Sequence, residues 1–214
     1  MKKYEAVIFD LDGVICFTDR FHYRAWKAVA DEIGVQFDET VNQRLRGVSR
    51  MASLEIILER ADREYSAEEK AELAEKKNNL YREMLRDMGP ADLAPEVRET
   101  MDALRAAGLR LAVGSSSKNT KYILSRIGLE DYFDAVSDGT NIQRSKPDPE
   151  VFLKAADDLL LSPSCCLVVE DAEAGVRAAC AGGFDSAGLG DAAESPLCTY
   201  PLARFSDLAR VCLG

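Results

Sequence analysis

The sequence predicts an α/β fold in which a doubly wound parallel sheet carries a helical domain inserted after its first strand. Short, almost continuously apolar runs recur along the chain, as expected of strands that are buried on both faces of a sheet. Helical patterns separate several of these runs, and this alternation is typical of parallel sheets. One long segment, from about residue 19 to residue 88, shows helical patterns without a convincing strand.

The predicted strands and their connecting helices form a Rossmann-like core that we assign to residues 1–15 and 92–214. The strands are YEAVIF (4–9), LRLAVGS (109–115), DAVS (134–137), CLVVE (166–170) and, more weakly, DSAGLG (185–190). Each connecting helical pattern ends near a glycine or a proline, which are common helix stop signals. These patterns cover residues 95–108, 117–128, 148–161 and 171–183.

The inserted segment predicts a helical cap domain, which we assign to residues 16–91. Three amphipathic helices are expected, at residues 19–34, 49–61 and 66–89. The last of them opens with Ser66 and Glu69 in the spacing of a capping box. Because the chain crosses between cap and core twice, near residues 16–19 and 89–95, the cap is expected to move on a hinge.

Composition limits the classes of function. Of the 214 residues, 47% are hydrophobic and 30% are charged, so a packed core is expected and disorder is not. The net charge of −10 argues against a general binder of nucleic acid or anionic membranes, because those proteins need a basic face. It does not exclude a small anionic substrate, since a few lysines and arginines can dominate a local site.

The remaining compositional signals indicate a cytoplasmic protein. Nothing in the sequence demands a dimer, so a monomer is expected. The six cysteines include no C-x-x-C pair, and with a single histidine the spacing of a zinc site is absent. Small core cysteines in a reducing compartment are the expected interpretation. Acidic residues interrupt the first apolar run, so no signal peptide is expected, and no run approaches the roughly 18 residues of a membrane span.

Two aspartates follow the first strand in the stretch FDLDG. Residues two apart on a strand face the same way, so Asp10 and Asp12 can converge beyond the carboxyl edge of the sheet, where open α/β sheets bind ligands. Two close carboxylates repel each other unless a proton or a cation joins them. Mg²⁺ is a suitable cation, because it binds carboxylates while keeping water and phosphate oxygens as ligands. Gly13 would permit a sharp turn of the backbone after the strand. The alternative interpretation is that Asp10 and Asp12 are exposed acids in a turn.

Other strand ends carry residues suited to phosphate chemistry. Ser115, Ser116 and Ser117, with Asn119, offer hydroxyl and backbone donors to an anion, although a simple helix cap needs only one of them. Lys146 stands beside a proline after the third strand, where a surface lysine is the ordinary alternative. Glu170 and Asp171 end the fourth strand, where Asp171 could instead cap the next helix. The coincidence of all four strand ends favours phosphoryl transfer.

In its four motifs, DLDG, GSSS, SKPDP and EDAEAG, the whole chain resembles the haloacid dehalogenase superfamily of phosphotransferases. The resemblance implies that Asp10 is a nucleophile that becomes phosphorylated and that Asp12 is the general acid and base. It implies Mg²⁺ held by Asp10, the backbone carbonyl of Asp12 and Asp171, with Glu170 beside them. Ser115 and Lys146 would bind the transferring phosphoryl group.

The cap motifs HYRAW, RGVSRMASL and KKN, with SSSKN in the core, are similar to those of the β-phosphoglucomutase group within this superfamily. The resemblance implies that this chain interconverts β-glucose 1-phosphate and glucose 6-phosphate through a bisphosphate. The resemblance places His22 near the acid/base, Arg50 and Ser53 at the distal phosphate, and Lys77 at the substrate. The remaining substrate-binding residues that it implies are Thr18, Gly47, Ser116, Ser117, Lys118 and Asn119.

Local alternatives stand beside these roles. Lys77 could be a lysine that extends from an apolar stripe to solvent, and His22 and Arg50 could be structural or exposed. Cys16 and Phe17 replace more polar residues expected in the hinge, where Thr18 remains.

At the level of function, a sugar-phosphate phosphatase on the same fold is the second interpretation, with Arg50 as the discriminating residue. A phospho-acceptor signalling domain using Asp138 is the third. Such domains are shorter and have no cap insert.

Overall fold

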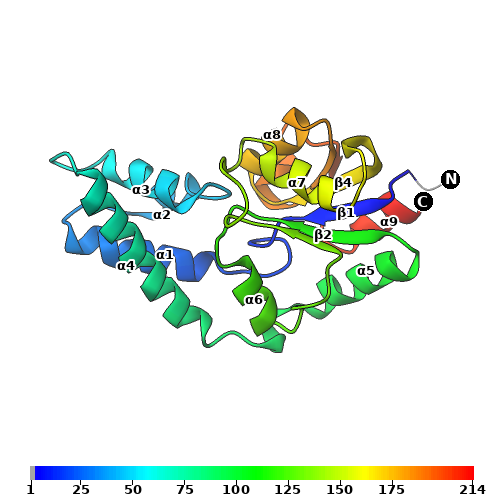
Figure 1. The fold of residues 1–214 in the computed structure, drawn as a ribbon, viewed down its shortest axis with the longest axis horizontal. Coiled ribbons are helices and arrows are strands. Elements are labelled where there is room, and N and C mark those ends of the chain that lie inside the picture. Colours follow the sequence, from blue (N-terminus) through cyan, green and yellow to red (C-terminus); the bar gives the residue numbers. More distant parts are fainter. Residues whose placement is uncertain (1–2) are drawn as a thin grey trace.

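The computed structural model describes residues 3–214, which contain a six-stranded sheet with helices on both faces (Figure 1). The strand order is β3-β2-β1-β4-β5-β6, and all neighbouring strands run parallel. The strands are β1 (Ala6–Phe9), β2 (Arg110–Gly114), β3 (Ala135–Ser137), β4 (Cys166–Glu170), β5 (Asp185–Gly188) and β6 (Tyr200–Pro201). The predicted α/β fold class is therefore confirmed, including the weakly indicated strand near residue 185.

Strand β1 lies at the centre of the sheet and is buried on both faces. Its residues 6–9 pair with residues 110–113 of β2 and 166–169 of β4. Val7 and Phe9 join one hydrophobic cluster, whereas Ala6 and Ile8 join another. Since side chains alternate across a strand, one short apolar run supplies both layers.

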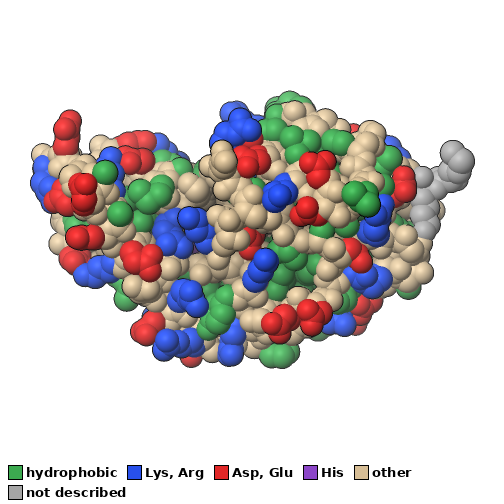
Figure 2. Space-filling model, in the orientation of Figure 1, with side chains coloured by type: hydrophobic (Ala, Val, Ile, Leu, Met, Phe, Trp, Pro, Cys, Tyr) green, Lys and Arg blue, Asp and Glu red, His purple; other side chains and the backbone are tan. Residues whose placement is uncertain are grey.

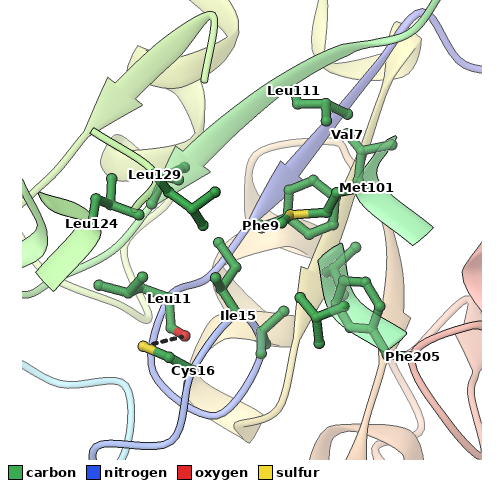
Figure 3. Close-up of a cluster of buried hydrophobic side chains, with 14 of the residues drawn as sticks. Val7, Phe9, Leu11, Ile15, Cys16, Met101, Leu111, Leu124, Leu129 and Phe205 are labelled. Carbon is green, nitrogen blue, oxygen red and sulfur yellow. Dashed lines mark hydrogen bonds between the residues drawn. The ribbon is translucent and has the colours of Figure 1, made fainter. Parts of the chain in front are cut away.

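Two helical layers cover these faces, and Figure 1 shows them on opposite sides of the sheet. Helices α5 (Pro95–Ala106), α6 (Thr120–Arg126) and α9 (Asp207–Leu213) contribute to the first cluster, and α7 (Glu150–Asp158) and α8 (Glu173–Ala181) to the second. Figure 3 shows Met101 beside Phe9 of β1 and Leu124 beside Leu129, and Phe205 stacks on Phe9. This rigid support positions the carboxyl ends of β1, β2 and β4 at one edge.

The segment after β1 folds into a helical cap at the left of Figure 1. Its helices are α1 (Asp19–Glu32), α2 (Glu39–Gln43), α3 (Arg50–Leu58) and α4 (Ala67–Leu85). They enclose a separate hydrophobic cluster around Trp26, Val29 and Leu54. The carboxyl-terminal part of α4, with Tyr81 and Leu85, packs instead into the cluster of the core. The division at residues 15/16 and 91/92 stays a prediction.

The predicted capping box at the start of α4 is present. The Ser66 hydroxyl accepts a hydrogen bond from the Glu69 backbone N–H, and the Glu69 carboxylate accepts one from the Ser66 N–H. Short elements escaped prediction, namely α2, β6, α9 and the 3₁₀ turns η1 (Pro90–Asp92), η2 (Pro163–Cys165) and η3 (Gly190–Glu194). A two-residue edge strand and helices of one or two turns carry too few residues to show a periodicity.

Cys16 and Phe17 replace the more polar residues expected in the hinge, and the two side chains have opposite surroundings. Cys16 is buried in the core cluster, and its thiol contacts the backbone carbonyl of Leu11 (Figure 3). Phe17, the next residue, is exposed.

Acidic and basic side chains are interspersed over the face drawn in Figure 2. Within residues 3–214, none of the helices has the length and apolar character that crossing a membrane requires.

Candidate active site

Strand β1 delivers Asp10 and Asp12 to the carboxyl edge of the sheet. Asp10 is buried and Asp12 is half-buried, so the alternative of two exposed acids in a turn is wrong. The backbone of Gly13 has φ +89°, and a β-carbon at this position would lie 2.0 Å from Asp171 Oδ2. Glycine is therefore needed both for the turn and for the close approach of Asp171.

Lys146 lies beneath the two acidic strand ends, and the alternative of a surface lysine is wrong. Its side chain is fully buried, with Nζ 2.5 Å from Asp10 Oδ1 and 2.5 Å from Glu170 Oε1. Burial lowers the pKa of Lys146, but the two carboxylates outweigh burial and hold this pKa above its ordinary value. The lysine is therefore a permanent positive charge beside Asp10.

Asp10, Glu170 and Asp171 form a group that could hold a metal ion. Each offers a carboxylate oxygen, and these atoms lie within 4.8 Å of one another. Burial and the charge of Asp10 raise the pKa of Asp171 to about 6, although Arg46 and Lys146 oppose the change. Burial likewise raises the pKa of Glu170. Clustered buried oxygens fit a hard divalent cation, which would remove this repulsion. Among the described residues, the Asp12 side chain is not part of this group.

Asp12 is held by a chain of hydroxyl groups. The Thr18 hydroxyl donates to Asp12 Oδ1, and the Tyr81 hydroxyl donates to Thr18 Oγ1 over 3.1 Å. Burial and the charge of Asp10 raise the pKa of Asp12 to about 7, against the effect of the Thr18 hydrogen bond. A carboxyl group that titrates near neutrality can both donate and accept a proton at physiological pH.

His22 and Lys77 extend from the cap toward Asp12. Lys77 Nζ lies 2.7 Å from His22 Nδ1, and His22 Nε2 lies 4.0 Å from Asp12 Oδ2, too far for a hydrogen bond. Burial, Lys77 and Arg50 hold the pKa of His22 well below its ordinary value, so the imidazole is neutral. When Lys77 is protonated it only donates, so Nδ1 then accepts and Nε2 carries the proton. In that state the N–H of His22 lies on the side of Asp12.

Lys77 is buried on the inner face of α4, and the alternative in which it extends to solvent is wrong. Its ammonium lies over the rings of Trp26 and Tyr81, 5.1 and 4.5 Å from their centroids. Burial and the charge of Arg50 lower the pKa of Lys77 to about 7. Such a shift at a cavity wall is typical of a functional site.

A cavity of about 570 Å³ lies between cap and core, a volume suited to a small-molecule ligand. It is lined by residues that the sequence predicted, namely Asp10, Asp12, His22, Gly47, Arg50, Ser53, Lys77, Ser115, Ser116, Ser117, Lys118, Asn119 and Asp171. Thr18, Lys146 and Glu170 are not in the lining but lie behind it. Thr18 reaches the lining through its hydrogen bond to Asp12, and Lys146 joins Asp10 to Glu170.

Cap and core meet at polar groups around this cavity. Arg50 Nη2 donates to Asn78 Oδ1 over 2.8 Å, and Asn119 Nδ2 donates to the same oxygen over 3.1 Å. The Ser116 hydroxyl donates to the backbone carbonyl of Gly47. Arg50 is thus neither exposed nor isolated, since it lies beside residues of the core.

Local roles account for part of the serine motif. Ser115 Oγ accepts a hydrogen bond from the Ser117 N–H, and Ser117 Oγ accepts one from the Asn119 N–H.

Two alternatives for acidic residues are not supported. Asp171 does not cap α8, whose N-cap residue is Ala172. Asp138 is buried, and its Oδ1 accepts hydrogen bonds from Thr140, which does not suit an accessible phospho-acceptor.

Sequence reasoning missed three residues of the site: Arg46, Asn78 and Tyr81. Arg46 and Asn78 lie inside the quoted motifs RGVSRMASL and KKN, but nothing in their spacing marked them. Tyr81 follows Lys77 by four residues and therefore shares its helix face, which is a signal that could have been used.

The chain matches the model of the haloacid dehalogenase-like hydrolase family over residues 4–183. This match covers most of the chain, so the protein belongs to this family of enzymes, and the predicted family resemblance is confirmed. The β-phosphoglucomutase of Bacillus subtilis (strain 168) is 42% identical over 188 residues, covering 87% of this chain and 83% of the relative.

Two further comparisons bear on the activity. The crystal structure of β-phosphoglucomutase from Clostridium difficile matches with a TM-score of 0.91 at 34% identity, covering 96% of this chain and 93% of the other. Fructose-1-phosphate phosphatase YqaB of Escherichia coli (strain K12) is 34% identical over 188 residues, covering 86% of this chain and 96% of the relative. The relatives therefore include both a mutase and a phosphatase.

Proposed function

We propose that this chain is a β-phosphoglucomutase that interconverts β-glucose 1-phosphate and glucose 6-phosphate through β-glucose 1,6-bisphosphate. The observation that carries the proposal is a single cavity with positive groups on both walls. Lys146 lies behind the core wall at Asp10, and Arg50 lies in the cap wall. A bisphosphate needs one such group for each phosphate.

Transfer begins at Asp10 in this mechanism. A carboxylate oxygen of Asp10 attacks phosphorus, a new P–O bond forms, and the bond between phosphorus and the sugar oxygen breaks. Lys146, 2.5 Å from Asp10 Oδ1, places positive charge beside the anionic transition state. Donors near Ser115 would bind the remaining phosphoryl oxygens.

Asp12 moves the proton in both directions. It first gives its proton to the departing sugar oxygen. It later takes a proton from the incoming hydroxyl, which attacks phosphorus as the bond to Asp10 breaks. The pKa of about 7 suits a group that serves as acid and then as base.

The acidic group beside Asp10 fits a divalent cation, which we propose to be Mg²⁺. Asp10, Glu170 and Asp171 would hold it, together with the Asp12 backbone carbonyl that the family resemblance implies. When bound, it would supply positive charge that stabilises the transferring phosphoryl group.

Arg50 and Ser53 in the cap, with Lys118 and Asn119 in the core, are proposed to bind the phosphate that is not being transferred. All four line the cavity. The planar guanidinium of Arg50 suits bidentate contact with a phosphate. Thr18, His22, Gly47, Lys77, Ser116 and Ser117 complete the proposed sugar-phosphate site.

Phosphorus NMR tests the proposal directly. The protein is incubated with β-glucose 1-phosphate, Mg²⁺ and a trace of the 1,6-bisphosphate. Accumulation of glucose 6-phosphate without stoichiometric inorganic phosphate supports the mutase, whereas release of glucose and inorganic phosphate contradicts it.

A sugar-phosphate phosphatase is the second candidate, supported by the similarity to the fructose-1-phosphate phosphatase. It would use Asp10, Asp12 and Lys146 in the same way, with water in place of the sugar hydroxyl. The same NMR experiment on fructose 1-phosphate separates the two activities. A cytoplasmic monomer acting on small sugar phosphates, with no nucleic acid or membrane partner, stays our expectation.

A further inference from the structure

Arg46 is a cap residue that reaches the acidic strand end of the core. It lies in the loop between α2 and α3 and lines the cavity. Its Nη2 pairs with Asp171 Oδ2, and its Nη1 lies 2.9 Å from Asp191 Oδ2. One cap side chain thus joins two carboxylates of the core.

The neighbouring backbone is fitted to this contact. A β-carbon on Gly47 would lie 3.5 Å from the β-carbons of both Ala172 and Ala174, so the loop rests on the start of α8. The Ser116 hydroxyl donates to the Gly47 carbonyl at the same place. The cap therefore sets the position of Arg46, and Arg46 can pair with Asp171 only when the cap is near the core.

We propose that Arg46 links closure of the cap to occupancy of the metal site, by pairing with Asp171 when the cap is closed and opposing cation binding there. The inference rests on the proposed role of Asp171 as a metal ligand. A guanidinium on one oxygen of a carboxylate reduces the attraction of that carboxylate for a divalent cation. By linkage, the bound cation weakens the Arg46 contact to the same extent and favours an open cap.

Lys146 does not have this property, although it also lies near the acidic group. It is buried in the core and contacts Asp10 and Glu170. Its charge is present whether the cap is open or closed. Only a charge carried by the cap can couple the two events.

Arg44 provides a matched control two residues away. It forms an ion pair with Glu59, with two N–O distances of 2.8 Å, and both partners belong to the cap. It is exposed, and its loss removes one positive charge from the same loop without removing a contact to the core.

The test measures Mg²⁺ affinity of the substrate-free protein by isothermal titration calorimetry. Arg46→Gln is expected to tighten binding about five- to ten-fold, in the range of ordinary coupling between two sites. Arg46→Lys keeps the charge and should stay within about two-fold of wild type, as should Arg44→Gln. Unchanged or weaker binding by Arg46→Gln would overturn the inference, whereas a wild-type protein that binds no Mg²⁺ would refute the metal site itself.

Small-angle scattering supplies a second readout. Mg²⁺ should increase the radius of gyration of the wild-type protein by opening the cap, and it should change that of Arg46→Gln much less. If Arg46 only stabilised the fold, its substitution would change neither the Mg²⁺ affinity nor the effect of Mg²⁺ on the radius of gyration. Equal Mg²⁺ responses in the two proteins would contradict the coupling.

Discussion

At the scale of single residues, two buried lysines show how partners decide the charge of a side chain. Lys146 contacts two carboxylates, which outweigh its burial and raise its pKa. Lys77 contacts an imidazole and two aromatic rings, and burial with the charge of Arg50 lowers its pKa to about 7. Lys77 should therefore cost stability in the folded protein, and that cost should depend on pH.

Lys77→Met is expected to stabilise the protein most at low pH. Lysine titrates near 10.5 in the unfolded chain and at about 7 in the folded one. Between these values the unfolded state binds more protons, so the free energy of unfolding of the wild type rises with pH. The advantage of the variant should therefore be largest at pH 7 and below, and should shrink by about 2 kcal/mol by pH 9.

Urea unfolding at pH 6, 7 and 9 measures this difference. The neighbouring Lys76, which is exposed and paired with Glu32, provides the control substitution Lys76→Met. A stability difference between Lys77→Met and wild type that stays constant over this range would contradict the lowered pKa.

Asp10→Asn tests the nucleophile. The amide keeps the shape of the side chain, so the fold should persist, but no acyl phosphate can form. Turnover should fall at least about a thousand-fold. Rapid acid quench with radiolabelled bisphosphate should detect label on the wild type and on Asp138→Asn but none on Asp10→Asn. Label retained by Asp10→Asn would point to another acceptor.

At the scale of elements, the strand ends define the site and the start of α8 closes it. Glu170 Oε2 accepts hydrogen bonds from the backbone N–H groups of Asp171 and Ala172. A β-carbon on Gly175 would lie 1.9 Å from the Glu170 carboxyl carbon. The helix therefore needs glycine here, although glycine normally weakens a helix.

Gly175→Ala separates these two effects. Helix propensity alone predicts stabilisation by about 1 kcal/mol. The clash with Glu170 should instead lower the free energy of unfolding by about 1–3 kcal/mol and weaken Mg²⁺ binding. Thermal unfolding and calorimetry measure the two quantities. A more stable variant with unchanged Mg²⁺ affinity would show that Glu170 moves freely.

The sequence predicted those elements in which burial dictates composition. Strands β1, β2 and β4 are apolar because both faces are covered, and the polar residues after them mark the edge of the sheet. Contacts between cap and core were not predictable in this way. The pairing of Arg46 with Asp171 joins residues 125 positions apart, and no local pattern encodes it. The buried state of Lys146 likewise depends on Asp10 and Glu170, which are distant in sequence.

At the scale of the whole molecule, we expect the cap to determine which hydroxyl would reach a phosphorylated Asp10. The cap supplies Arg50 to the cavity, and its pairing with Asn78 connects it to Asn119 of the core. A glucose phosphate that meets a phosphorylated Asp10 would place its own phosphate at Arg50 and its free hydroxyl at Asp10, whereas an aryl phosphate has no group for the cap wall. The loss of Arg50 should therefore affect the choice of substrate more than it affects the rate of the chemical step.

Arg50→Ala is expected to raise KM for both glucose phosphates by about ten- to hundred-fold, the effect of losing one charge-assisted contact or two. Hydrolysis of an aryl phosphate, whose only phosphate is the one transferred to Asp10, should change less than about three-fold. Steady-state kinetics on the two substrate classes give the comparison. An equal loss on both would place Arg50 outside the distal phosphate site.

His22 provides the last test, because a mutase must prevent Asp12 from activating water before the sugar is in place. With Lys77 protonated, His22 Nε2 carries a proton and lies 4.0 Å from Asp12 Oδ2, so further closure of the cap on a sugar phosphate would complete a hydrogen bond. His22→Ala should then reduce transfer to the sugar by about 10²–10⁴-fold, the usual range for acid–base positioning. Hydrolysis of the phosphoenzyme should fall less or rise. Phosphoenzyme decay is measured with and without glucose 1-phosphate in both proteins. If wild-type phosphoenzyme reacts with water as fast as with the sugar phosphate, the cap does not discriminate between them, and the phosphatase is the better description.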